Sequence, residues 1–291
     1  MASSGIVPSP RFLRILALAA AAVWLAACAQ HRGPIVIGAA GPLSQPFGES
    51  LQRGMRLAVD QINGRGGVAG GRRLELRFVD DSGSPDVAVR VAQVLYDDRR
   101  VVAVVGHVTS GPTIAAARVY GGGSTPVPVI SPTASSPELS GITPWFFRVC
   151  PTAVSHGPAL ARFARQTLGA RPAGVIYAND DYGRGCWPVI GGDGLTGIEA
   201  SGALAEGLRI SISYLPDRVS ARNAAFVRAY AQAYNGQRPD DTGAGAYDVV
   251  SLLAHVFEQG AADRRGVRER LAVVGRGGSP FEGVTGAIAF D

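Results

Sequence analysis

Hydroxyl side chains gather in the loops that follow two apolar segments of the sequence. Thr109 and Ser110 come after residues 101–105, and a second group comes after residues 127–130. The second group is Ser131, Thr133, Ser135 and Ser136. Hydroxyls and free backbone N–H groups at one edge of a sheet suit the carboxylate of a small zwitterion. Ordinary loop chemistry also places Ser and Thr after strands, so both interpretations stay open at this point.

Motifs for catalysis and for nucleotide binding are weak. The sequence contains no lysine, so it lacks the lysine that a phosphate-binding P-loop requires. Ser110 does not lie in the GxSxG motif of a nucleophile elbow. The run Gly191-Gly192-Asp193-Gly194 is similar to a turn of lipid and NAD kinases, but no further acidic cluster supports a kinase. We therefore expect that the protein is not an enzyme.

The composition also argues against metal and nucleic-acid sites. The chain of 291 residues is 46% hydrophobic and carries a net charge of +5, which falls to +3 without the two arginines near the N-terminus, Arg11 and Arg14. The arginines form no stripe interleaved with aromatics, and the four histidines lie far apart. We expect no cofactor, no metal and no nucleic-acid partner. Whether Cys150 and Cys186 form a disulfide stays open.

The N-terminus has the pattern of a lipoprotein leader. Arg11 and Arg14 precede an apolar run that ends in Leu25-Ala26-Ala27-Cys28. Small residues before a cysteine suit cleavage after residue 27 and transfer of a lipid to the Cys28 thiol. A transmembrane anchor is the alternative, but residues 12–27 are fewer than the roughly 20 that a spanning helix needs. We expect a lipid-anchored protein of the periplasm or cell surface.

Strands and helices alternate along the rest of the chain. Strands are predicted at residues 35–40, 74–78, 101–105, 127–130, 145–149, 174–178, 188–190, 208–215 and 286–290. Helices are predicted at residues 49–63, 85–98, 111–120, 152–168, 198–206, 221–234, 244–259 and 267–274. Such alternation predicts an α/β fold with parallel sheets and a ligand site at the carboxyl ends of the strands.

A set of motifs in fixed order resembles one known family. The motifs are Ile37-Gly38, Gly41-Pro42-Leu43-Ser44, Leu57-Ala58-Val59-Asp60-Gln61-Ile62-Asn63, Gly66-Gly67-Val68, Asp80-Asp81, Val105-Gly106-His107, Ile130-Ser131-Pro132-Thr133-Ala134-Ser135, Phe146-Phe147-Arg148-Val149-Cys150-Pro151-Thr152, Tyr182-Gly183, Gly191-Gly192-Asp193-Gly194-Leu195 and Val284-Thr285-Gly286. They are similar to the branched-chain amino-acid-binding proteins of ATP-binding-cassette importers, the type I periplasmic binding proteins typified by the leucine/isoleucine/valine-binding proteins. The resemblance runs from residue 35 to residue 291.

The resemblance implies a two-lobed, hinged fold that closes on its ligand. Lobe one would comprise residues 34–150 and 216–291, and lobe two residues 151–215. Ser110, Thr133 and Ser135 would hold the ligand's carboxylate and amino group, and Asp193 would neutralise the ammonium. Tyr182 would close the pocket, and Phe47 stands where the family often has Tyr.

The sequence departs from the family pattern in three places. Thr242 stands where an aromatic usually lines the side-chain pocket. About 60 residues, or two strand–helix units, are missing after Tyr182-Gly183. The chain also stops at Asp291, before the family's final hinge crossing. Lobe two is therefore expected to be reduced and ligand binding to be impaired.

These observations favour a substrate-binding lipoprotein. Its partners would be a branched-chain or similar amino acid and the membrane permease of an ATP-binding-cassette importer, with the lipid as its only membrane contact. The alternative is a ligand-sensing or interaction protein on the same scaffold, without transport.

Overall fold

A computed structural model of the chain describes residues 33–167, 211–276 and 279–290. Strands and helices alternate through its first half. They are β1 (Ile35–Gly41), α2 (Pro46–Gly64), β2 (Leu74–Asp80), α3 (Pro85–Asp97), β3 (Val101–Val105), α4 (Ser110–Gly121), β4 (Val129–Ser131), a short 3-10 helix η1 (Pro137–Leu139), β5 (Phe146–Arg148) and α5 (Ala153–Gln166). The remainder forms α6 (Ala221–Ala233), α7 (Asp241–Glu258), α8 (Arg264–Leu271), β6 (Phe281–Glu282) and β7 (Ala287–Ile288).

Strands β1 to β5 form one parallel sheet, as the alternating pattern predicts. Their order is β2-β1-β3-β4-β5, and the register pairs Ile35 with Leu74 and Val104 with Val129. β1, β3 and β4 are buried along their whole length, because helices cover both faces of the sheet. β2, in which residues 74–78 alternate between apolar and polar, is an edge strand of the sheet and is only partly buried. The chain is therefore an α/β protein with a doubly covered parallel sheet.

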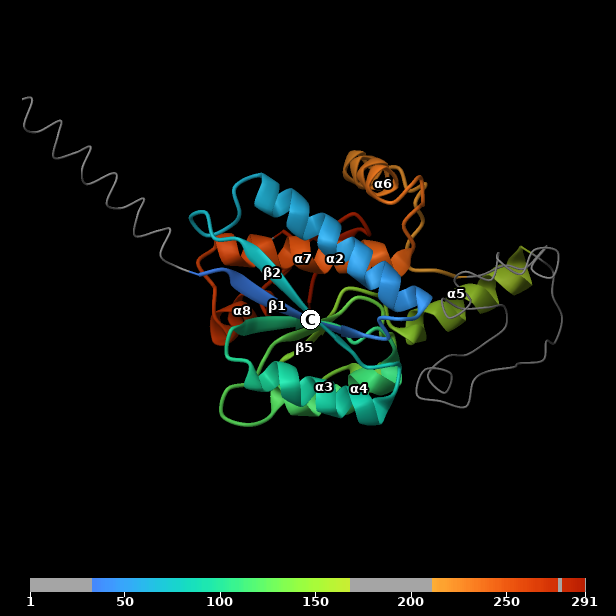
Figure 1. The fold of residues 1–291 in the computed structure, drawn as a ribbon. Coiled ribbons are helices and arrows are strands. Elements are labelled where there is room, and N and C mark those ends of the chain that lie inside the picture. The colour runs from blue at the N-terminus through green and yellow to red at the C-terminus, as the bar shows by residue number, and fades with distance from the viewer. Residues whose placement is uncertain (1–32, 168–210, 277–278, 291) are drawn as a thin grey trace, which may run out of the picture.

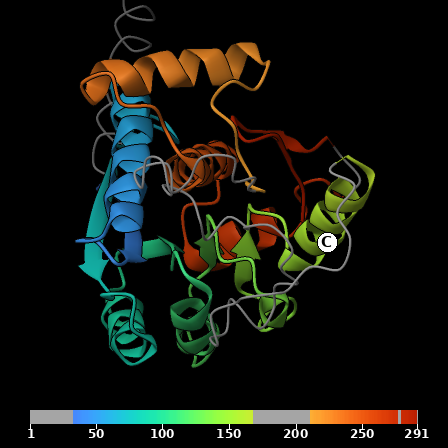
Figure 2. The ribbon, with the colours of Figure 1, turned by 90° about the vertical axis from the view of Figure 1, so that its right-hand side faces the viewer.

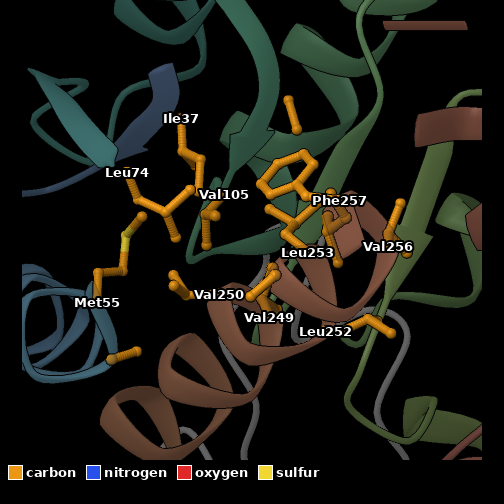
Figure 3. Close-up of a cluster of buried hydrophobic side chains, with 14 of the residues drawn as sticks. Ile37, Met55, Leu74, Val105, Val249, Val250, Leu252, Leu253, Val256 and Phe257 are labelled. Carbon is orange, nitrogen blue, oxygen red and sulfur yellow. The ribbon is translucent and has the colours of Figure 1, made fainter. Parts of the chain in front are cut away.

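Two layers of helices enclose the sheet. Figure 2 shows α2 and α7 on one face and α3 and α4 on the other. Along β1, successive side chains point to opposite faces, so Ile35 and Ile37 join the core under α2 and α7 while Val36 faces α3 and α4. Figure 3 shows Met55 of α2 and Val250 and Phe257 of α7 in the first of these cores.

Several helices begin earlier than periodicity alone predicts. α3 is an exception: it begins at the predicted residue, and Ser84 Oγ accepts a hydrogen bond from Val87 N at 3.4 Å. α7 begins after Asp240 instead of at residue 244, because the Asp240 carboxylate accepts from Gly243 N at 2.8 Å. α8 likewise begins after Asp263, which accepts from Gly266 N at 2.9 Å. Capping residues precede the first apolar position of each helix, so the apolar pattern starts late.

The structure corrects one predicted strand and shortens another. Residues 211–215, the described part of the strand predicted at 208–215, form no strand. Tyr214 instead packs its ring against Phe226 of α6 and donates a hydrogen bond to Asn223 Oδ1 at 2.6 Å. Of the strand predicted at 286–290, only β7 pairs, and it does so antiparallel to β6. The predicted elements at 174–178, 188–190 and 198–206 lie outside the described residues.

The parallel sheet has a carboxyl edge, where its strands end, and an amino edge, where its strands begin. The loops that leave β1, β3 and β4 meet at its carboxyl edge, and α5 extends away from the sheet on that side (Figure 1). The chain enters β1 at the opposite, amino edge, where α8 also lies (Figure 1). No helix within residues 33–167, 211–276 and 279–290 combines the length and hydrophobicity that crossing a membrane requires.

Candidate functional site

The structure brings together the hydroxyl loops that follow β3 and β4. Ser110 is the first residue of α4, and its Oγ accepts a hydrogen bond from Ser136 N at 3.3 Å. Thr133 Oγ1 donates to Val108 O at 2.7 Å. Because each loop bonds the other, Ser110, Thr133 and Ser135 share one small region at the carboxyl edge of the sheet.

Ser135 has an unusual environment within this region. Its side chain is buried, yet its Oγ has no hydrogen-bond partner in the part of the chain that the structure describes. Its backbone carbonyl accepts from Ala153 N at 2.8 Å, which ties this loop to the first turn of α5. A buried hydroxyl without a partner costs about 1 to 3 kcal/mol of stability. The Ser135 hydroxyl therefore lacks, among the described residues, the hydrogen bond that a buried hydroxyl normally has.

The first turn of α4 adds positive potential beside these hydroxyls. The backbone N–H groups of Ser110 and Gly111 have no acceptor within the helix, as in any first turn. The helix dipole makes this end attractive to an anion. Together, the free N–H groups and the hydroxyls of Ser110 and Ser135 can donate hydrogen bonds to a small carboxylate without a cationic side chain, while Thr133 donates to Val108 O.

A fully buried polar cluster lies behind the β3 loop. His107 Nδ1 lies 2.5 Å from Asp81 Oδ2, and His107 Nε2 lies 3.3 Å from Tyr120 OH. The backbone carbonyl of His107 accepts from Ser131 Oγ at 2.7 Å and from Thr113 Oγ1 at 3.2 Å. Burial raises the pKa of Tyr120, so its hydroxyl stays protonated and can donate to Nε2. The cluster fixes the backbone that leads to Ser110.

The wide spacing of the four histidines bears only on metal binding and does not predict this role of His107. A different signal is present, because Asp80-Asp81 and Val105-Gly106-His107 lie at or just after the ends of predicted strands. Polar residues that follow strands of one parallel sheet lie at the same edge, so this rule predicts Asp81 and His107 on the same side of the sheet, although β1 lies between their strands. Within the described residues, no group of His, Cys, Asp and Glu side chains could hold a metal ion.

The other predicted site residues have different outcomes. Phe47 lies in the first turn of α2 and packs, half-buried, against the core beneath α2 and α7. Tyr182 and Asp193 lie outside the described residues, as does Cys186, whose pairing with Cys150 the sequence leaves open. Thr242 is buried at the start of α7, and its backbone N–H donates to Asp241 Oδ1 at 2.9 Å. The structure thus groups three of the six predicted ligand-binding residues.

A cavity of about 280 Å³ adjoins the β4 loop. It is bounded by Pro132 of that loop, by Arg148 and Cys150 at the end of β5, by Asp241 and Gly245 of α7 and by the segment around β7. The Arg148 guanidinium points to the same loop, because Nη1 donates to Ser136 O at 2.8 Å. Burial lowers the pKa of Arg148 from its ordinary value. The cavity therefore lies between α7 and the start of the loop that carries Thr133 and Ser135.

Comparison with known proteins places this geometry in context. A family model described as "Periplasmic binding protein" matches residues 34–192. An "Amino acid binding protein" of Pseudomonas aeruginosa is 35% identical over 179 residues, which are 59% of this chain and 46% of that protein. A "Leucine-specific-binding protein" of Salmonella typhimurium is 29% identical over 232 residues, which are 78% of this chain and 60% of that protein. The chain therefore spans about half the length of the curated relatives it matches.

One similar solved structure is the branched-chain amino acid transporter substrate binding protein LivJ of Streptococcus pneumoniae in complex with isoleucine. The TM-score is 0.74 at 25% sequence identity, and the match covers 89% of this chain and 92% of the other. The fold that the two share is that of the two-lobed periplasmic binding proteins.

Proposed function

Because this chain belongs to the periplasmic binding protein family, we propose that it is the substrate-binding lipoprotein of an ATP-binding-cassette importer for branched-chain or similar amino acids. The observation that carries the proposal is the buried Ser135 hydroxyl, which has no partner among the described residues and lies in the loop bonded to Ser110. The named ligands of the similar proteins, leucine and isoleucine, support the choice of ligand.

The ligand's carboxylate would bind at the first turn of α4. It would accept from the N–H groups of that turn and from the hydroxyls of Ser110 and Ser135. The Thr133 hydroxyl, whose proton goes to Val108 O, would accept from the ligand's ammonium group. Asp193 would pair with the ammonium group, Tyr182 would cover the ligand, and Phe47 would lie at the pocket margin. Every group named for the carboxylate is neutral, so the ligand we propose is zwitterionic with an apolar side chain.

Calorimetric titration with leucine tests this site. Loss of a hydrogen bond to a charged group costs about 1.5 to 3 kcal/mol, which is roughly tenfold or more in affinity. We expect that loss for Ser135→Ala, Ser110→Ala and Asp193→Ala. Ser124→Ala is the matched control, because Ser124 is exposed and precedes β4 at the opposite edge of the sheet. Unchanged affinity in all three site variants would remove these residues from the site, and leucinamide should bind weakly because it lacks the carboxylate.

The leader pattern supports a lipid anchor at Cys28. One diacylglycerol with a further acyl chain holds a protein firmly on a membrane. Detergent phase partitioning measures this anchoring. We expect the parent chain and Cys150→Ser in the detergent phase and Cys28→Ser in the aqueous phase. A Cys28→Ser form that partitions like the parent would refute the anchor.

The proposed lobes are residues 34–150 with 216–291, and residues 151–215. α7 and α8 pack on the same sheet as residues 35–148, which supports the first grouping. α5 begins the second segment and extends away from that sheet (Figure 1). We propose that the second lobe is reduced relative to the family, and that affinity is lower than in a full-length relative because part of the clamp is missing.

A further inference from the structure

Charge is segregated between the two edges of the parallel sheet. The segments that enter β2 and β3 carry pairs of arginines, and α8 adds a third group beside them. These residues are Arg72, Arg73, Arg99, Arg100, Arg264, Arg265 and Arg268. The loops that leave β1, β3 and β4, at residues 42–45, 106–109 and 132–136, contain no arginine. The amino edge therefore carries a dense group of arginines, whereas the ligand edge has Arg148 at the end of β5 and none in these three loops.

The acidic residues at the amino edge do not neutralise this charge. Asp98 forms ion pairs with two arginines, Arg77 and Arg100. Glu269 pairs with Arg265 at 2.8 Å. Asp97 accepts from Gln93 Nε2, and Asp263 caps α8. More arginines than carboxylates remain at this edge of the sheet.

Three arginines of this edge bond to neutral oxygens instead of carboxylates. Arg99 Nη1 donates to Thr125 Oγ1, and Arg268 Nε donates to Pro144 O at 3.1 Å. Arg264 donates to backbone carbonyls only, those of Val101 at 2.8 Å and Thr125 at 2.9 Å among them. A guanidinium bonded to a hydroxyl or carbonyl keeps its full charge for an outside partner.

These side chains line a groove of about 670 Å³ between α8 and the segments that enter β3, β4 and β5. Arg99, Arg265 and Arg268 border it, together with the half-buried Trp145. A planar guanidinium binds a phosphate through two parallel hydrogen bonds. Trp is enriched where proteins meet the headgroup region of a bilayer. The groove thus offers phosphate donors and an amphipathic ring on the same surface.

The chain also enters the sheet at this edge. Arg72 Nε donates to Gly33 O at 2.9 Å, and Arg72 Nη2 donates to Pro34 O at 3.4 Å, which fixes the start of β1 there (Figure 1). Cys28 precedes Gly33 by five residues, which span at most about 18 Å when extended. A lipid on Cys28 would therefore hold this edge, and no other, within roughly two Debye lengths of the membrane at physiological salt.

We propose that the arginine-bearing amino edge docks on a bilayer of anionic phospholipids, with the phosphates in the groove beside Trp145. The proposal rests on the lipid anchor proposed for Cys28. Docking in this orientation turns the hydroxyl loops away from the membrane, toward the solution from which ligand arrives. Neutral bilayers would leave the tethered protein free to tumble, because they offer no net negative charge to the arginines.

Fluorescence of Trp145 tests the docking on the intact lipidated chain. Cleavage after residue 27 removes Trp24, so Trp187→Phe leaves Trp145 as the sole tryptophan of the lipidated chain. The protein is placed on phosphatidylcholine vesicles that contain about 30% phosphatidylglycerol, or none, with a spin label on the lipid headgroups. We expect strong quenching of Trp145 only on the anionic vesicles, and release when sodium chloride rises from about 50 to 500 mM.

Charge variants identify the arginines responsible. Arg73→Gln and Arg99→Gln should each lower the docking constant about fivefold, and both together about 25-fold, as expected for removal of one surface charge each. Arg228→Gln is the matched control, because Arg228 is exposed on α6, away from this edge. Thermal unfolding by circular dichroism shows whether each variant is folded.

Two outcomes would overturn the proposal. Equal quenching on neutral and anionic vesicles would mean that the lipid anchor alone brings Trp145 to the surface. Absence of quenching on anionic vesicles would mean that this edge meets another partner, such as an acidic protein segment. Neither outcome affects the proposed amino-acid site, which calorimetry tests separately, and mass spectrometry of Cys28 tests the anchor itself.

Discussion

Asp248 of α7 and Thr285 are joined by two hydrogen bonds to one carboxylate oxygen. Thr285 N donates to Asp248 Oδ2 at 2.8 Å, and Thr285 Oγ1 donates to the same atom at 2.6 Å. The second oxygen, Oδ1, accepts from Val284 N at 2.7 Å. Asp248 is fully buried, so three donors and one carboxylate satisfy each other inside the protein. This bond set fixes the turn between β6 and β7 on α7, next to the cavity near Pro132.

Asp248→Asn should destabilise the protein. The amide retains one acceptor oxygen and presents an NH₂ group to a donor, so at least one of the three hydrogen bonds is lost and a buried donor is left unpaired. We expect the free energy of unfolding to fall by about 1 to 3 kcal/mol, measured by urea denaturation. Asp217→Asn is the control, because Asp217 is largely exposed and pairs only with Arg238. Equal effects of the two changes would contradict the assigned role of Asp248.

Asp98 should make stability depend on pH in the acid range. The hydrogen bond from Arg100 holds the pKa of Asp98 well below its ordinary value of 3.8. A lowered native pKa contributes stability above the unfolded pKa, and this contribution is lost as the pH falls below it. We expect the free energy of unfolding of the parent to fall more steeply than that of Asp98→Asn between about pH 5 and pH 3. Asp97→Asn should follow the parent, because Asp97 is exposed and bonded to Gln93.

Much of the sheet and its helices could be predicted from the sequence, for a physical reason. Residues 101–105 are all apolar and β-branched or small, and they form β3 with the predicted bounds. Ser84 and Pro85 mark the start of α3, because a cap and a first-turn proline act locally. Residues 211–214 alternate between serine and apolar side chains, as a half-buried strand would, yet they form no strand. Tyr214 instead donates a hydrogen bond to Asn223, a tertiary contact that no local pattern encodes.

Part of the candidate site could likewise be predicted from the sequence, and part could not. Ser110, Thr133 and Ser135 follow strands, so the topological rule for parallel sheets brings them to one edge. The hydrogen bond between Ser110 and Ser136 joins residues 26 positions apart. This bond, and the lack of a partner for Ser135 Oγ among the described residues, depend on the conformations of two loops. The clustering of arginines at the amino edge has no signal in the sequence, because it arises only when β2 and β3 pair in parallel with the two sides of β1.

Arg264 should be the most important arginine for stability. Its guanidinium donates to four backbone carbonyls, including those of Tyr96 at 2.9 Å and Asp98 at 2.8 Å, and fastens α8 to the amino ends of β3 and β4. Arg264→Met keeps much of the aliphatic stem and removes every donor, so buried carbonyls lose their partners. We expect a loss of about 2 to 4 kcal/mol in the free energy of unfolding.

Arg270→Met provides the comparison for Arg264, since it makes the same chemical change on an exposed position of α8. It should alter the free energy of unfolding by less than about 0.5 kcal/mol. Arg264→Lys should recover part of the loss, because an ammonium group donates to fewer carbonyls than the planar guanidinium. A Lys variant as stable as the parent would show that charge, and not the fork of donors, holds α8.

The buried cluster of Asp81, His107 and Tyr120 should respond unequally to changes at its two ends. Asp81→Ala leaves the His107 ring without its 2.5 Å partner and Gly83 N without its acceptor, and we expect a loss of about 3 kcal/mol or more. Tyr120→Phe removes only the 3.3 Å contact to His107 Nε2 and keeps the ring in the core, so the loss should be about 1 kcal/mol.

Ligand affinity distinguishes a positioning role for this cluster from a merely structural one. If His107 holds the loop that carries Ser110, Asp81→Ala should weaken leucine binding at a temperature where circular dichroism still shows a folded protein. Tyr120→Phe should bind as the parent does. Equal affinity in both variants would restrict the cluster to stability.

Hydrogen exchange should be much faster in α5 than in the sheet and its covering helices. Four of the 14 residues of α5 are buried, and Val154 and Phe163 expose 61% and 37% of their surface. Pro158 also interrupts the hydrogen bonds of this helix. By contrast, 14 of the 18 residues of α7 are buried, and β3 is buried throughout. Few buried apolar contacts give a low free energy of local opening, so amides of α5 should exchange early, and limited proteolysis should cut there before it cuts β3 or α7.

If the second lobe closes on a ligand, saturating leucine should slow exchange in α5 and leave β3 unchanged. Equal protection of α5, α7 and β3 without ligand would show that the segment after residue 150 is as stable as the sheet, and would remove the basis for a weakened clamp.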